Sequence, residues 1–297
     1  MRSRASRSVV LSAGAALSAV GLVLAHGCGR DESGSGRETR ERRASQVAAA
    51  WDGSAAASEW RSGFHPMGDM VQLPKGGPRS KADARAVRER GFVLEGRLPA
   101  ARPQDGRVAW DGGESLARPL AGAHESFETL TGARVGGKPH LTVTGAKLGE
   151  MTVATSRGPA VVPAWLFRLK GYDSPLKRAA VAPSTLPQPP IEQAREDPGH
   201  LDRLVEVSSD GRSVTVVALR GACDGDSVVE VLETRGSVVL SATVEDPQNG
   251  GDCTAQLLSQ QVTVTLKRPV GDRVLLDAHT GRPVACKPWL GPSPSWS

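Results

Sequence analysis

Four cysteines are the residues whose chemistry is easiest to read in this 297-residue chain. Cys28 follows a long apolar run near the N-terminus, whereas Cys223, Cys253 and Cys286 all lie in the last third. A cysteine directly after an apolar leader is a candidate for lipid attachment, and paired cysteines in an oxidising compartment form disulfides. The positions therefore indicate lipid attachment at Cys28 and disulfide formation among the three later cysteines.

The N-terminus has the pattern of an export signal. Three arginines within the first seven residues precede Ser8–Ala25, which is uncharged and mostly apolar. The next residues, Ala25-His26-Gly27-Cys28, are similar to a bacterial lipobox, in which the cysteine is acylated and becomes the mature N-terminus. The sequence thus favours removal of residues 1–27 and lipidation of Cys28. Two alternatives stay open: cleavage after Ala25 without a lipid, and a retained membrane span of about 18 residues.

The composition after Cys28 predicts a tether. Gly29–Gly36 is rich in Gly and Ser, and Arg37–Arg43 mixes both signs of charge. Such a segment buries little apolar surface, so residues 28–62 are expected to be flexible. We expect the protein outside the cytoplasm, tethered through its lipid to the outer face of the cell membrane or secreted.

A disulfide is predicted between Cys223 and Cys253. These cysteines flank two β-rich runs, Ser227–Glu233 and Ser237–Val244, joined by Thr234-Arg235-Gly236 as a hairpin. Antiparallel strands return to their starting point, so the two cysteines should meet at the open end. The bridge would close a loop of about 30 residues and contribute about 3–4 kcal/mol. Cys286 is then the odd thiol, either buried and inert or exchanged with one of the presumed partners.

Two motifs have catalytic spacing but lack the residues that the chemistry needs. Gly132–Pro139 (GARVGGKP) has the spacing of a phosphate-binding loop, but Pro139 stands where a hydroxyl must bind Mg²⁺. Ser174–Lys177 (SPLK) has the S-x-x-K spacing of penicillin-recognising acyltransferases without their partner motifs. We therefore predict no catalytic, cofactor-binding or metal-binding residues and no cofactor.

The distribution of charge argues against nucleic-acid binding. Residues 1–43 contain eight arginines and four acidic residues, which accounts for +4 of the formal net charge of +5. The rest of the chain is nearly neutral, so it has little field with which to concentrate phosphate groups. No nucleic acid is expected as a partner.

The body begins with a predicted α+β domain over residues 63–182, built on an antiparallel sheet. Ser80–Gly91 has helix-capping residues at its start, and Asp111-Gly112 is a hairpin turn signal. His140–Lys170 is expected to form three strands. The first turn falls at Leu148-Gly149 and the second at Arg157-Gly158-Pro159.

The third of these strands is predicted to bury one face. Val161, Pro163, Trp165, Phe167 and Leu169 alternate with other residues, as in a half-buried strand. Residues 183–200 contain five prolines and read as a linker. Residues 201–290 follow as short strands with regular turns, which predicts a small disulfide-stapled β-sandwich. The fold class expected is therefore α+β, mostly β.

Four segments resemble one family. The strings LTVTGAKLG, TVATSRGPA, VPAW and TVTLKRPVGDRVLLDAHTGRPV are similar to parts of uncharacterised secreted lipoproteins of high-GC Gram-positive bacteria, over residues 63–284. The resemblance implies export and agrees with a Cys223–Cys253 pair and an unpaired Cys286. It implies no activity, substrate or site.

These features favour a non-catalytic binding or interaction module at the cell envelope. Its partners would be the membrane, through the lipid, and an envelope protein or ligand. One alternative is a secreted hydrolase that uses loop residues such as His65, His124 or Asp111. The other alternative is an accessory structural subunit of an envelope complex.

Overall fold

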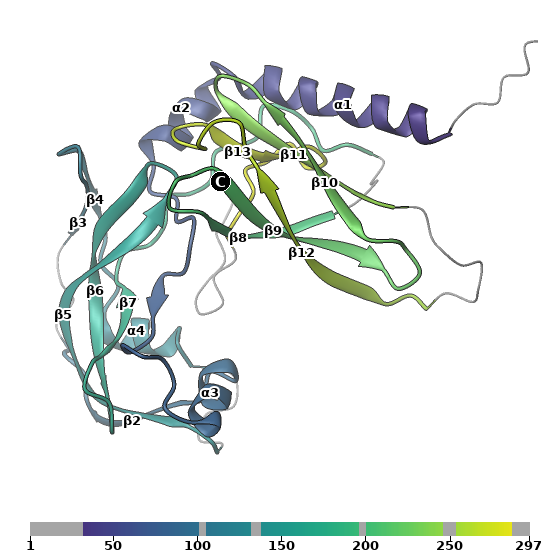
Figure 1. Ribbon diagram of the computed structural model, residues 1–297. Coiled ribbons are helices and arrows are strands. Elements are labelled where there is room, and N and C mark those ends of the chain that lie inside the picture. Colours follow the sequence, from purple (N-terminus) through teal and green to yellow (C-terminus); the bar gives the residue numbers. More distant parts are fainter. Residues whose placement is uncertain (1–31, 101–104, 132–137, 196–199, 246–253, 287–297) are drawn as a thin grey trace, which may run out of the picture.

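The computed structural model describes residues 32–100, 105–131, 138–195, 200–245 and 254–286, and in these ranges the chain is mostly β with several sheets, as predicted (Figure 1). The elements up to residue 182 are α1 (Glu32–Trp51), α2 (Ala55–Ser62), β1 (Val71–Gln72), α3 (Lys81–Arg88), β2 (Phe92–Arg97), β3 (Gly106–Trp110), β4 (Ser115–Arg118), α4 (Ala123–Glu128), β5 (Leu141–Thr155), β6 (Gly158–Leu169) and β7 (Leu176–Ala179). The later elements are β8 (His200–Val207), β9 (Ser213–Gly221), β10 (Ser227–Glu233), β11 (Ser237–Val244), β12 (Leu257–Thr265) and β13 (Val274–Asp277).

Strands β1–β7 form one seven-stranded sheet, which with α3 and α4 is called the first lobe. Strand β6 is at the centre and pairs with β5 along one edge, and β5 pairs in turn with β2. Along its other edge, β6 pairs with β7, which leads to β1, and with β3, which leads to β4. Most pairs are antiparallel, but β2 pairs with β5 in parallel, with Phe92 opposite Leu141. The prediction of a purely antiparallel sheet is wrong at this edge. The reason is that β3, β4 and α4 lie between the two strands in sequence, a connection long enough for a parallel return.

Strands β5 and β6 form one long hairpin rather than parts of three strands. The predicted turn at Leu148-Gly149 is wrong, because β5 continues through it to Thr155. Gly149 is opposite Ala164, and a Cβ on Gly149 would lie 2.6 Å from Leu166 Cδ1. Glycine is therefore needed here for close side-chain approach and not for a turn.

Strand β6 buries opposite faces at its two ends. Trp165, Phe167 and Leu169 pack into a core with α3, while residues of the other parity pack on the opposite side of the sheet. Val161, which was predicted to share the buried face of Trp165, is 36% exposed. The single buried face is therefore wrong for the start of the strand. The buried residues of the other parity are Ala160, Val162 and Ala164.

Strands β8–β13 form two three-stranded sheets around one core. The sheets have the orders β10-β11-β13 and β12-β9-β8, and the predicted β10–β11 hairpin is confirmed. Valines from both sheets, such as Val216 and Val239, are fully buried in the same cluster. These two sheets with α1 and α2 are called the second lobe.

The helices α1 and α2 contradict the predicted flexible tether over its described part, residues 32–62. Helix α1 lies along β10 and β11 (Figure 1), and Trp51 Nε1 donates a hydrogen bond of 2.7 Å to the Gly281 carbonyl. The first turns of α1 are rich in Gly and Ser, and this content obscured a stripe of apolar residues at helical spacing later in the same helix. Spacings of three and four residues place this stripe on one face, in the core of the second lobe. Its members are Ala44, Val47, Ala48 and Trp51.

The proline-rich segment that follows β7 joins the two lobes and also packs against the second lobe. Pro183–Arg195 contains no helix or strand. Yet Leu186 is buried in the core of the second lobe, and Ser184 Oγ accepts a hydrogen bond of 2.9 Å from the Phe64 backbone N–H. In the described ranges, no helix combines the length and the apolar character needed to cross a membrane.

Candidate functional site

The predicted cysteine sites fall mostly outside the described residues. Cys28 and Cys253 both lie there. Cys223 is not without an interaction partner, but a disulfide with Cys253 stays a prediction. Cys286 is a free, buried thiol in an isolated bridge with Leu204 of β8.

The residues of the hydrolase alternative do not form a catalytic set in the described part of the chain. His124 lies exposed on α4, and Asp111 lies exposed in the turn after β3. His65 is buried, and neither of its ring nitrogens has a hydrogen-bond partner among the described residues. No hydrogen bond or ion pair links any two of these three in the described ranges. Within the same ranges, no group of three His, Cys, Asp or Glu side chains could hold a metal ion.

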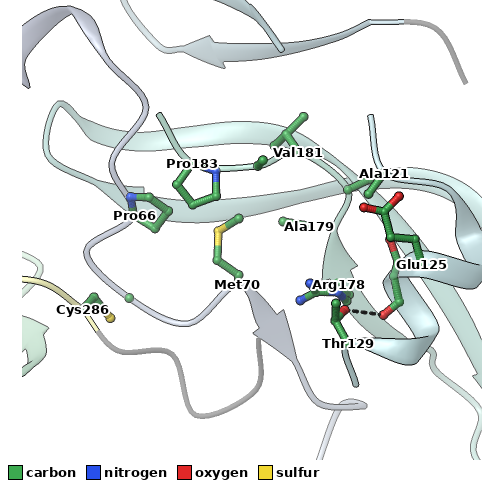
Figure 2. A pocket seen from close by; sticks show the side chains of 14 residues that line it. Pro66, Met70, Ala121, Glu125, Thr129, Arg178, Ala179, Val181, Pro183 and Cys286 are labelled. Carbon is green, nitrogen blue, oxygen red and sulfur yellow. Dashed lines mark hydrogen bonds between the residues drawn. The ribbon is translucent and has the colours of Figure 1, made fainter. Parts of the chain in front are cut away.

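A cavity of about 130 Å³ lies where the first lobe meets Cys286 of the second (Figure 2). Its walls come from the chain before β1, from β7 with the residues that follow it, and from α4. In the view of Figure 2, Cys286 and Pro66 are at one end and Glu125 at the other, with Met70 and Arg178 between them. The two ends differ in chemistry.

Arg178 is the polar centre of the cavity. The register of β7 places it between Val71 of β1 and Trp165 of β6, so its backbone is fixed on both sides. The residue is only 7% exposed, and its Nε is buried without a hydrogen-bond partner. In the part of the chain that the structure describes, the guanidinium makes neither a hydrogen bond nor an ion pair. Nε is therefore a buried donor that lacks an acceptor among the described residues, and an anion in the cavity would supply both the acceptor and the counter-charge.

The electrostatics agree with this geometry. Burial lowers the pKa of Arg178 to about 10, and the positive charge of Arg90 acts in the same direction. The carboxylate of Glu125 opposes this lowering without forming an ion pair with Arg178. Arg178 therefore remains charged at neutral pH while lacking a counter-ion in direct contact.

Helix α4 adds a second unused polar group. Ser126 is 1% exposed, lines the cavity, and its hydroxyl has no hydrogen-bond partner in the described ranges. Its backbone carbonyl accepts a hydrogen bond of 2.8 Å from Thr129 Oγ1, which fixes this turn (Figure 2). A guanidinium and a hydroxyl that both lack partners within the described residues thus line one cavity.

The other end of the cavity is apolar. Pro66 and Pro183 line it, Met70 lies next to them, and Cys286 closes it from the second lobe (Figure 2). Burial raises the pKa of the Cys286 thiol to about 11, with a further contribution from Asp69. The thiol is therefore protonated at neutral pH and behaves as a small apolar group.

A stacked pair lies behind this apolar end. The rings of Trp60 and His65 are 4.2 Å apart between centroids and 3° from parallel, beside a small cavity of about 10 Å³ that also touches Pro66, Pro183 and Cys286. Burial, with the charge of Arg118, lowers the pKa of His65 to about 4. His65 is neutral at pH 7, so it cannot serve there as a charged ligand group.

Sequence reasoning missed Arg178, although a signal was present. In Leu176–Ala180 (LKRAA), Leu176, Arg178 and Ala180 share one parity, so an arginine stands among apolar residues on one strand face. Comparison with family models, curated proteins and solved structures finds no match for this chain, so the site rests on its own geometry.

Proposed function

We propose that this protein is a non-catalytic binding module and that its ligand is an anion held in the Arg178 cavity. The observation that carries the proposal is the buried guanidinium of Arg178, which has no partner in the described ranges. A charged hydrogen bond from an anion would satisfy it and would be about twice as strong as a neutral one. The bound ligand would thus supply the negative charge that balances Arg178.

Binding is better supported than hydrolysis. Nucleophilic hydrolysis needs a nucleophile within hydrogen-bond reach of a base. Neither nitrogen of His65 forms a hydrogen bond in the part of the chain that the structure describes, and burial keeps the thiol of Cys286 protonated. The cavity offers donors and an apolar wall, which suit recognition.

The proposed location is the outer face of the cell membrane. The leader and the lipobox-like sequence before Cys28 support export and acylation, and the family resemblance supports the same compartment. Export would also allow a Cys223–Cys253 disulfide to staple the second lobe, which we propose to be a β-sandwich. Only residues 29–31 separate Cys28 from α1, a reach of about 14 Å at most, so a lipid would hold the second lobe close to the bilayer. An envelope protein remains a proposed partner alongside the ligand.

Thermal unfolding tests the binding function. Anionic and matched neutral compounds are each added to purified protein, and the midpoint of unfolding is measured. We expect at least one anion, and no matched neutral compound, to raise the midpoint, because a ligand that binds only the folded state stabilises it. Arg178→Met should abolish the rise, whereas Arg168→Met, which removes an exposed arginine of β6, should leave it unchanged. Equal effects of neutral and anionic compounds would contradict the proposal.

Intact mass of the membrane-extracted protein tests the location. Acylation of Cys28 and loss of residues 1–27 are expected together, and comparison with and without reduction counts the bridged thiols. A full-length chain in the cytosol with all four thiols alkylatable would contradict export.

A further inference from the structure

We infer that the ligand of the Arg178 cavity is a small monocarboxylate with an apolar body, its carboxylate on Arg178 and Ser126 and its body against Met70 and Pro66. This inference rests on the proposed binding function and names the class of ligand. It follows from the size of the cavity, the number of its donors and the nature of its far wall.

Size sets the first limit. The cavity measures about 130 Å³. An apolar protein cavity of about 150 Å³ holds benzene, which has six non-hydrogen atoms, so this cavity encloses about six. A ligand of up to about nine non-hydrogen atoms fits with one end outside it. Long acyl chains, sugars larger than one ring and nucleotides are too large to be enclosed.

The donors set the charge of the ligand. The planar guanidinium of arginine matches the two oxygens of a carboxylate. In the described ranges, Arg178 and the Ser126 hydroxyl are unpartnered donors that line the cavity. The guanidinium fork binds two oxygens side by side and the hydroxyl can reach a third, so one of the four phosphate oxygens would be left without a donor. Glu125 lies close enough to influence Arg178, so a second negative charge on the ligand would be repelled. The site therefore suits a monoanion.

The far wall excludes polar bodies. Met70, Pro66 and Pro183 offer no side-chain hydrogen-bond donor, and the protonated thiol of Cys286 is a weak one. A hydroxylated ligand would bury hydroxyl groups without partners, which is unfavourable. An alkyl chain of a few carbons or a single phenyl ring would instead remove apolar surface from water.

Isothermal titration calorimetry with defined probes tests the inference on the full chain. The probes are sodium acetate, hexanoate, benzoate, succinate, dodecanoate and inorganic phosphate. Hexanoate or benzoate should bind at least tenfold more tightly than acetate, succinate, dodecanoate or phosphate. Arg178→Lys should weaken binding of the best probe about 10- to 100-fold, the range expected for a lost charged hydrogen bond. Arg168→Met should leave it unchanged.

Two further variants place the ligand within the cavity. Ser126→Ala should weaken all carboxylates, because it removes a donor near the charge. Cys286→Leu should weaken hexanoate but not acetate, because it narrows only the apolar end. Thermal melts confirm that each variant folds. The same loss for both acids in Cys286→Leu would overturn the assigned orientation.

The outcomes separate the inference from the function on which it rests. If phosphate or succinate binds tightest and Arg178→Met abolishes it, the anion site stands and the monocarboxylate is wrong. If dodecanoate binds tightest, the size limit is wrong. If no anion binds, or if binding survives in Arg178→Met, both the inference and the proposed function fail.

Discussion

Acid should destabilise this protein in a way that depends on one buried side chain, His65. Its folded-state pKa is about 4, mainly because burial disfavours the charged ring, whereas the ordinary value is 6.5. The unfolded chain therefore binds a proton near pH 6.5, and the folded chain binds it only near pH 4. Since the unfolded state binds more protons between these values, stability falls as the pH falls through this window.

The magnitude follows from the two values. Between pH 7 and pH 4, the difference in proton affinity corresponds to about 3 kcal/mol of unfolding free energy, at about 1.4 kcal/mol for each tenfold change. Carboxylates also contribute to acid unfolding, so the wild type alone cannot isolate the effect. His65→Phe provides the comparison, because a phenyl ring can keep the stack on Trp60 and carries no proton.

The assay is urea unfolding of both proteins at pH 7, 5.5 and 4, followed by tryptophan fluorescence. We expect the wild type to lose about 3 kcal/mol more than His65→Phe over this range. At pH 7 the variant should be at least as stable as the wild type, because it removes two buried nitrogens without partners in the described ranges. Parallel losses in the two proteins, within about 1 kcal/mol, would refute the buried neutral His65.

Five other variants test the packing and the site. Trp51→Ala should lower the unfolding free energy by about 3–5 kcal/mol in a denaturant titration. Trp51→Phe should lower it by about 1 kcal/mol through the lost hydrogen bond to Gly281. An unchanged unfolding free energy in Trp51→Ala would mean that α1 is not packed on the second lobe. Arg178→Met without ligand should raise the thermal midpoint by about 2–4 °C, because it removes a buried charge, and a lower midpoint would point to an overlooked partner. Gly149→Val should destabilise the β5–β6 hairpin, because the new side chain would clash with Leu166. Gly171→Ala is the control, at a left-handed position with open space around it, and should lower the unfolding free energy by only about 1 kcal/mol in the same titration. Similar losses of unfolding free energy in the two variants would refute the clash.

Local signals in the sequence predicted the elements whose causes are local. Ser80 caps α3 by accepting a hydrogen bond of 3.0 Å from the Asp83 N–H, and Asp111-Gly112 turns β3 into β4. A cap or a turn involves neighbouring residues, so it can be read without the fold. The helical stripe that ends at Trp51 could have been read in the same way, but the Gly/Ser content before it obscured the pattern.

Tertiary packing decided the rest, because it joins residues far apart in sequence. The sequence by itself determined a mostly β chain, its hairpins and the residues that favour export. Only the fold revealed that β6 buries opposite faces at its two ends, since two cores lie on opposite sides of the sheet. Only the fold placed Arg178, Ser126 and Met70 around one cavity, with no ion pair to Arg178 in the described ranges, because burial and partnership depend on neighbours that no spacing along the chain specifies.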